Sequence, residues 1–149
     1  MKNDKIKAVE QLFRELIPLY HKKLSIIFRE DDEDAKIRCH KNQKRAILLI
    51  AQEKGVILSE LGRFLDMRKG SLTSLIDSLE ANGLVERRSD KNDRRKTLLY
   101  LTPAGEKYYR QLLAQSSKTY QQLFSRLSAE ELDDFLRSLQ VVVQGLRKI

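Results

Sequence analysis

The sequence predicts a mainly helical protein of one domain, residues 1–149, that contains one short β-hairpin. Three observations lead to this fold class. Apolar residues recur every three or four positions over most of the chain, the period changes to two around residues 84–101, and 41% apolar with 34% charged residues suits a domain with one core. No apolar run approaches the roughly 20 residues that span a bilayer, and residues 1–10 lack the apolar core of a signal peptide. We therefore expect a cytoplasmic protein that makes no membrane contact.

The first predicted element is a long amphipathic helix over about residues 6–28. Pro18 should bend or divide this helix near residues 14–18, because proline removes a backbone donor and clashes with the preceding turn. Five consecutive acidic residues at 30–34 favour an exposed loop. The basic run at 36–45 could either contact phosphate or balance the acidic run.

Three shorter helices are predicted next. The first runs from about Gln43 to Lys54 and ends at Gly55, and two more follow, joined by a tight turn over residues 66–69. Helical spacing marks the side chains that should face the core, which are Leu61, Phe64 and Leu65 before the turn and Leu72, Leu75, Ile76 and Leu79 after it.

A cationic hairpin should follow the last of these helices. That helix should end at Asn82-Gly83, because glycine readily takes the left-handed conformation of a helix C-cap. Period-two patterning at 84–88 and 96–101 predicts two strands, joined by a loop at 89–95. Residues 87–96 contain six basic and two acidic side chains, so positive charge is concentrated around the loop.

Two long helices should close the chain. Thr102-Pro103 is typical of a helix start, and Ser128 with Glu131 forms a capping box that opens the last helix. The apolar stripes of the first and last helices are larger than one subunit would cover. We therefore interpret 1–42 and 103–149 as dimerisation helices that flank a lobe formed by residues 43–102.

This order of elements predicts a winged helix-turn-helix, mainly α, with a two-stranded β wing. In that fold the second short helix enters the major groove of duplex DNA and the hairpin contacts nearby phosphates or the minor groove. A net charge of +8, from 29 basic and 21 acidic residues, agrees with a polyanionic partner. The expected DNA-binding residues on the helix are Arg68, Lys69, Ser71, Thr73 and Ser74, and the polar face of this helix continues to Asp77 and Ser78. Those on the wing are Arg88, Lys91, Asn92, Arg94 and Arg95. Asp93 should stabilise the wing turn by pairing with Arg95.

The stretch from Leu58 to Gly105 resembles the MarR family of winged-helix bacterial regulators. Its segment Asp90-Lys91-Asn92-Asp93-Arg94-Arg95 matches the family pattern D-x-R-D-x-R at three of four fixed positions, and GLVERR before it and LTPAG after it also match. Asn92 stands where the family usually has arginine, which removes one possible DNA contact. The resemblance implies a homodimer that binds a near-palindromic operator, usually as a repressor, and that a small phenolic ligand, oxidation or a metal often releases.

Other features have two interpretations. Tyr20, His21 and Tyr108 could line an effector cleft, or they could pack in a core or dimer contact. Cys39 beside His40 could sense peroxide or bind a metal, although a surface cysteine without such a role is the simpler interpretation.

Enzymatic function is not expected. One cysteine and two histidines cannot complete an ordinary zinc site, and the chain has neither a glycine-rich phosphate loop nor a nucleophile with its base, so we expect no metal and no cofactor. The alternatives to sequence-specific regulation are a basic helical interaction protein and a non-specific architectural DNA binder.

Overall fold

The computed structural model describes residues 1–28, 37–53 and 55–149. They divide into two compact units, Met1–Ala114 and Gln115–Ile149, and each unit is described by itself. The acidic run at 30–34 lies outside the described residues, as do Lys36 and Lys54.

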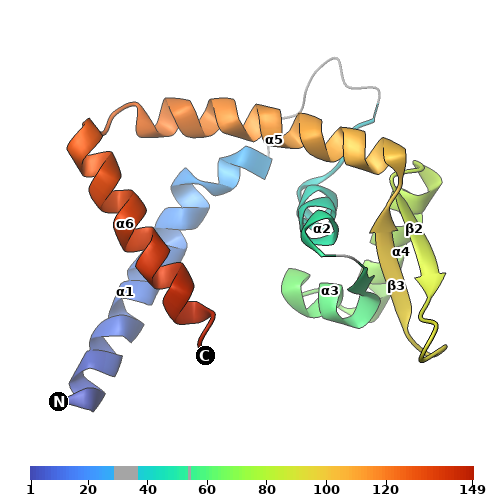
Figure 1. Ribbon diagram of the computed structural model, residues 1–149, viewed down its shortest axis with the longest axis horizontal. Coiled ribbons are helices and arrows are strands. Elements are labelled where there is room, and N and C mark those ends of the chain that lie inside the picture. Colours follow the sequence, from blue (N-terminus) through green and yellow to red (C-terminus); the bar gives the residue numbers. More distant parts are fainter. Residues whose placement is uncertain (29–36, 54) are drawn as a thin grey trace. The chain divides into compact units, whose positions relative to one another are not determined.

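The elements follow the predicted order, with one additional strand (Figure 1). In chain order they are α1 (Lys2–Lys23), a 3-10 turn η1 (Ser25–Phe28), α2 (Lys41–Gln52), β1 (Val56–Ile57), α3 (Leu58–Leu65), α4 (Lys69–Ala81), β2 (Val85–Ser89), β3 (Thr97–Leu101), α5 (Pro103–Phe124) and α6 (Ala129–Leu146). The mainly helical fold class is confirmed.

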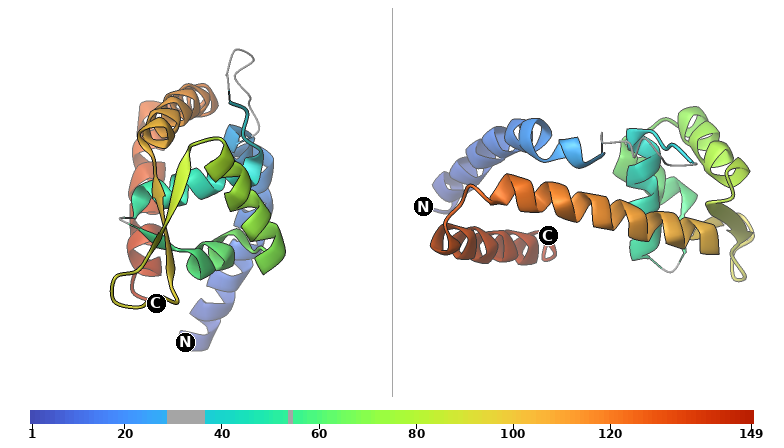
Figure 2. Two further views of the ribbon diagram at one scale, coloured as in Figure 1. Left: turned by 90° about the vertical axis from the view of Figure 1, so that its right-hand side faces the viewer. Right: turned by 90° about the horizontal axis from the view of Figure 1, so that it is seen from above.

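The small sheet is antiparallel and has the order β1-β3-β2, so β3 is its central strand. The hairpin pairs Arg87 with Leu99, and β1 pairs Val56 with the same Leu99 from the other side. Figure 2 shows β2 and β3 as a twisted pair whose loop projects away from the helices. The second strand of the wing is therefore paired along both edges at Leu98 and Leu99.

The core of the first unit lies between α2, α3, α4 and the sheet. Its fully buried side chains include Ile47, Ile50, Leu61, Ile76, Leu79, Leu84 and Leu99. The expected inward face of α4 is confirmed at Leu72, Ile76 and Leu79, which are all buried. One expectation for α3 is wrong, because Phe64 is 64% exposed while Leu61 and Leu65 are buried.

Backbone caps end α4 as the sequence predicts. Gly83 has φ +70°, its N–H donates to the Glu80 carbonyl at 2.9 Å, and the Leu84 N–H donates to the Leu79 carbonyl at 3.0 Å. This pair of bonds is a Schellman motif, and it turns the buried Leu84 back onto the last turn of α4.

The start of α5 is joined to the end of α4 through Thr102. Its hydroxyl donates to the Gly83 carbonyl and accepts from the Gly105 N–H at 3.0 Å, and its own N–H donates to the Leu84 carbonyl at 3.1 Å. Pro103 is the first helical residue, as expected.

Two features of the N-terminal region differ from expectation. Pro18 lies inside α1 and does not divide it, so of the two expected effects of this proline the division is wrong. Because no residue of α1 is buried in the single chain, water can solvate the Arg14 carbonyl that proline leaves without a donor. Cys39, expected at the surface, is only 3% exposed and belongs to the core cluster of the first unit.

The second unit contains the rest of α5 and α6. Ser128 and Glu131 form the predicted capping box: the Glu131 N–H donates to the Ser128 hydroxyl at 3.2 Å, and the Ser128 N–H donates to the Glu131 carboxylate at 2.7 Å. Phe124 and Phe135 pack with ring centroids 5.2 Å apart, which joins the two helices across this turn.

Candidate nucleic-acid interface

Helix α4 presents a polar face because its apolar residues are held in the core. Arg68 caps the helix, and Lys69, Ser71, Thr73 and Ser74 are all exposed. Short polar side chains beside the free N–H groups of a helix start suit the major groove and its flanking phosphates. The structure thus brings the five predicted helix residues together on one accessible surface.

Two hydroxyls on this face are already donating hydrogen bonds. The Thr73 hydroxyl donates to the Lys69 carbonyl at 2.9 Å, and the Ser74 hydroxyl donates to the Gly70 carbonyl at 3.2 Å. Their outward lone pairs remain as acceptors, so in this rotamer both side chains match the amino groups of adenine or cytosine.

The last part of the expected polar face has partners within the protein. Ser78 accepts a hydrogen bond from the Gln43 side chain at 3.0 Å, which ties α4 to α2. Asp77 accepts from Nη2 of Arg87 at 2.6 Å. The part of this polar face that is left for a ligand is therefore the first half of α4, before Asp77.

Arg87, on β2, is a residue that the sequence analysis missed. Its guanidinium pairs with Asp77 and Glu80, and its backbone N–H donates to Glu80 Oε1 at 3.4 Å. Burial alone would lower the pKa of Arg87, but the hydrogen bonds to Asp77 and Glu80 outweigh it and raise that pKa. One sequence signal could have predicted this pairing. The two carboxylates are three residues apart, which places them on one face of the helix, and a basic strand follows closely.

The wing turn is built on two aspartates. Asp90 Oδ1 accepts from the Asn92 N–H at 2.6 Å and from the Asp93 N–H at 3.2 Å, and the Asp90 N–H donates to the Lys96 carbonyl at 3.0 Å. Asp93 Oδ1 accepts from the N–H of Arg95 at 3.1 Å and from its Nε at 3.2 Å. The predicted pairing of Asp93 with Arg95 is present in the turn, and Asp90 is a second anchor.

The cations of the wing differ in their partners. Arg88 pairs with Glu86 and lies 4.5 Å above the centroid of the Tyr100 ring, so it is not a free phosphate ligand. Lys91 and Arg94 are exposed and, within the described part of the chain, form no ion pair or side-chain hydrogen bond. Lys96 is also exposed, but it interacts electrostatically with Asp90, so Lys91 and Arg94 are the wing cations most available to a polyanion.

The remaining candidate residues lie away from this surface. Tyr20 and His21 pack edge to face on α1 with centroids 5.6 Å apart, and Tyr108 packs against the core of the lobe. Lys44, in the basic run, is only 2% exposed. Cys39 is buried, and a thiol so placed lacks the solvent access that oxidation requires.

The described residues contain neither a cluster of metal ligands nor a membrane-spanning helix. No group of three or more His, Cys, Asp or Glu side chains among them could hold a metal ion. No helix in that part of the chain is long and apolar enough to cross a membrane.

The hydrogen bonds to Asp90 predict how the wing responds to acid. The N–H groups of Asn92 and Asp93 lower the pKa of Asp90 below the ordinary value of 3.8. A lowered pKa in the folded state means that the carboxylate holds the turn at neutral pH, and that this contribution is lost only as the pH falls through the lowered value. Amide NMR shifts of Asn92 and Asp93 should therefore change with a midpoint below 3.8. Asp90→Asn, which keeps the acceptor but cannot titrate, should remove that transition, and a midpoint at or above 3.8 would contradict the assignment.

The helix pair α3–α4, the outward polar face of α4 and the β2–β3 wing define a winged helix-turn-helix protein. Residues 41–97 match the MarR family, so the chain contains a MarR-family winged helix-turn-helix domain, as its resemblance predicted. The crystal structure of wild-type MarR in its apo form from E. coli is similar, with a TM-score of 0.74 and 26% identity, over 86% of this chain and 93% of that one.

Curated relatives agree with this family. The transcriptional repressor MprA of Escherichia coli K12 is 39% identical over 58% of this chain and 50% of its own length. The HTH-type transcriptional regulator SarZ of Staphylococcus haemolyticus is 31% identical over 66% of both chains. The chain thus spans about half of the first relative and 66% of the second, and both relatives are named as regulators, not as enzymes.

Proposed function

We propose that this protein binds duplex DNA sequence-specifically as a homodimer and regulates transcription, as a repressor that a small ligand or another signal releases. The observation that carries the proposal is the exposed polar start of α4 on the same lobe as a wing with two uncommitted cations, Lys91 and Arg94. The regulator and repressor names of the relatives support it.

Affinity and sequence preference should come from different side chains. Arg68 and Lys69, at the start of α4, and Lys91 and Arg94, on the wing, are placed to neutralise phosphates, which supplies affinity without reading sequence. The short hydroxyl side chains of α4 are placed to meet base edges, and these contacts supply preference for particular bases.

A dimer would cover apolar surface that the single chain leaves exposed. The exposed apolar residues of α1 include Ile6, Val9, Leu12, Leu16, Ile17 and Leu19, and those of α6 include Leu132, Phe135, Leu136, Leu139, Val142, Val143 and Leu146; each of these is between 39% and 64% exposed. Continuous apolar faces of this size mark an interface between proteins. A two-fold dimer would place two α4 helices on half-sites about 34 Å apart.

The dimer is tested by placing a charge on the apolar face of α6. Leu139 is 48% exposed in the single chain, and burying a carboxylate there would oppose association. Leu139→Asp should therefore shift the protein from twice the mass of one chain toward a single chain, measured by light scattering after size exclusion. Ser138→Asp, on the neighbouring exposed position, should leave the mass unchanged. If both variants keep the parent mass, α6 does not form the interface.

The wing is tested at Arg94. Removing one phosphate contact should weaken binding to all duplexes alike and lower the slope of log affinity against log salt by about one unit. Fluorescence anisotropy of Arg94→Ala at several salt concentrations measures both quantities. Arg126→Ala removes an exposed arginine of the second unit and serves as the control. An unchanged affinity and slope in Arg94→Ala would exclude the wing from the interface.

Selection from a random duplex pool tests the proposed function as a whole. A near-palindromic consensus supports a sequence-specific dimer. Enrichment without a consensus would indicate an architectural DNA binder, and no enrichment would indicate an interaction protein instead. With a selected duplex in hand, anisotropy in the presence of simple phenolic acids tests the release by a ligand.

A further inference from the structure

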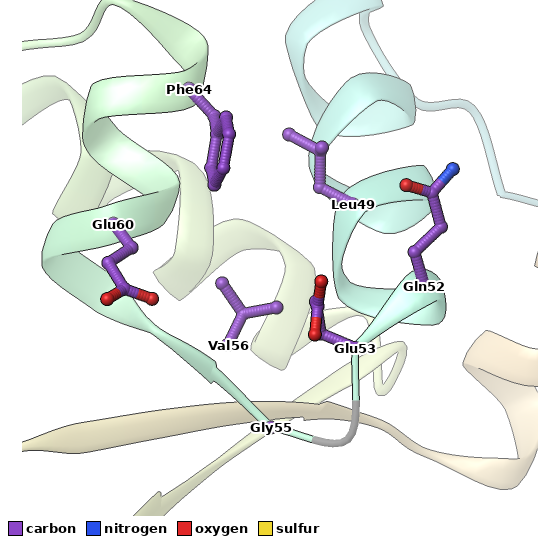
Figure 3. Close-up of a pocket in the computed structure, with 7 residues that line it drawn as sticks. All are labelled: Leu49, Gln52, Glu53, Gly55, Val56, Glu60 and Phe64. Carbon is purple, nitrogen blue, oxygen red and sulfur yellow. The ribbon is translucent and has the colours of Figure 1, made fainter. Parts of the chain in front are cut away.

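The lobe contains a cavity of about 280 Å³ between the end of α2, β1 and the exposed side of α3 (Figure 3). It is lined by Leu49, Gln52, Glu53, Gly55, Val56, Glu60 and Phe64. Figure 3 shows Phe64 and Leu49 facing each other across it, Val56 below them, and Glu60 and Glu53 on opposite sides of Val56. An apolar floor thus lies between two carboxylates.

Phe64 is an apolar side chain of α3 that is not buried in the core. Its neighbours Leu61 and Leu65 are 0% and 4% exposed, whereas Phe64 is 64% exposed. A single exposed apolar residue is ordinary on a protein surface. What distinguishes Phe64 is that its ring borders a cavity and has acidic groups beside it.

The two carboxylates of the cavity differ from most acidic side chains of the lobe in having no ion-pair or hydrogen-bond partner among the described residues. The lobe, residues 43–102, contains eight acidic side chains. Five of them pair with cations or accept backbone N–H groups, namely Asp77, Glu80, Glu86, Asp90 and Asp93. Glu53 and Glu60 form no ion pair or side-chain hydrogen bond within the described residues, and only Asp66 shares that state. Two of these three therefore lie on one small cavity.

We propose that this cavity binds a small organic cation, an apolar body that carries a quaternary or protonated amine. The body would rest on Val56 and Leu49, and the cationic end would lie against the face of Phe64 and between the two glutamates. An anion of equal size would be repelled by both carboxylates. The volume is just below the range of about 300–1,000 Å³ typical of ligand sites, so the ligand should be small, with about ten non-hydrogen atoms.

Arg63 allows a test of the electrostatic part of the proposal. It is one turn away from Glu60 and lines an adjoining hollow with Glu60 and Phe64. Its positive charge opposes a bound cation, so removing that charge should strengthen binding while removing either glutamate weakens it.

The experiment is an amide NMR titration of the DNA-free, full-length protein with phenyltrimethylammonium, so its result does not depend on the proposed function. The shifts should change at Gly55, Val56 and Glu60, with a dissociation constant of about 1 mM. Benzenesulfonate, the anionic control, should not shift these amides. Absence of shifts at these residues with the cation, or equal shifts with both probes, would overturn the proposal.

Substitutions then test which side chains contribute to binding of the cation. Glu53→Gln and Glu60→Gln should each weaken binding of the cation about two- to fivefold, and Phe64→Leu should weaken it by a similar factor. Arg63→Gln should strengthen it about twofold, whereas Glu106→Gln, an exposed carboxylate on α5, should have no effect. The spectrum of each variant shows that it is folded. An affinity that is unchanged in both glutamate variants would also overturn the proposal.

Discussion

Gly105→Ala is expected to destabilise the protein by at least about 3 kcal/mol. A Cβ built at Gly105 would lie 2.0 Å from the Leu84 carbonyl oxygen and 3.0 Å from the Leu84 carbonyl carbon. These are backbone atoms, and Leu84 cannot easily move, because its carbonyl accepts from Thr102 and its N–H closes the cap of α4. The methyl group would therefore separate α5 from the end of α4.

Urea unfolding followed by circular dichroism measures this loss. The matched control is Gly70→Ala in the first turn of α4, where an added Cβ meets nothing within 4 Å. Alanine is the better helix former, so this variant should be as stable as the parent or more stable, by up to about 1 kcal/mol. Equal stability of the two variants would show that α5 does not approach Leu84 as described.

Arg87→Ala should weaken binding of a selected duplex about tenfold, although Arg87 itself need not touch DNA. The guanidinium pairs with Asp77 and Glu80, and its loss would leave two uncompensated carboxylates on α4, the helix proposed to contact DNA. It would also remove the link between the wing strand and α4. The free energy of unfolding should fall by only about 1 kcal/mol, because both ion pairs are partly exposed. Anisotropy and urea unfolding measure the two effects.

A rescue variant separates positioning from direct contact. If the uncompensated carboxylates cause the loss, adding Asp77→Asn and Glu80→Gln to Arg87→Ala should restore most of the DNA affinity. If Arg87 contacts phosphate directly, neutralising those two side chains would restore little, and Arg87→Ala alone would lower the salt slope by about one unit, as expected for Arg94.

Much of the fold could be predicted from local patterns. The apolar spacing of α4, the glycine at its end and the capping box before α6 are local signals, and each is found in the structure. The strand β1 was missed because two residues cannot display an alternating pattern. Phe64 was misplaced because α3 has only eight residues, and so short a helix does not reveal how wide its buried face is.

The candidate site could be predicted less completely, because partners distant in sequence decide which charges are free. The sequence placed the polar start of α4 and the basic wing, and both are exposed. It did not show that Arg88 lies over Tyr100 or that Arg87 pairs with Asp77. Strand alternation assigns a side chain to a face of the sheet, but it does not say which helix residue lies opposite.

The junction at Thr102 connects α5 to the surface that is proposed to bind DNA. One threonine hydrogen-bonds to the last residues of the turn after α4 and to the first turn of α5, so it joins the end of α4, the wing and the start of α5. A tilt of the first turn of α5 would therefore move α4 and the wing together. A regulatory signal would then change the distance between the two α4 helices of the proposed dimer. DNA binding would tolerate base pairs inserted between the half-sites differently, while the preferred bases of each half-site would stay the same.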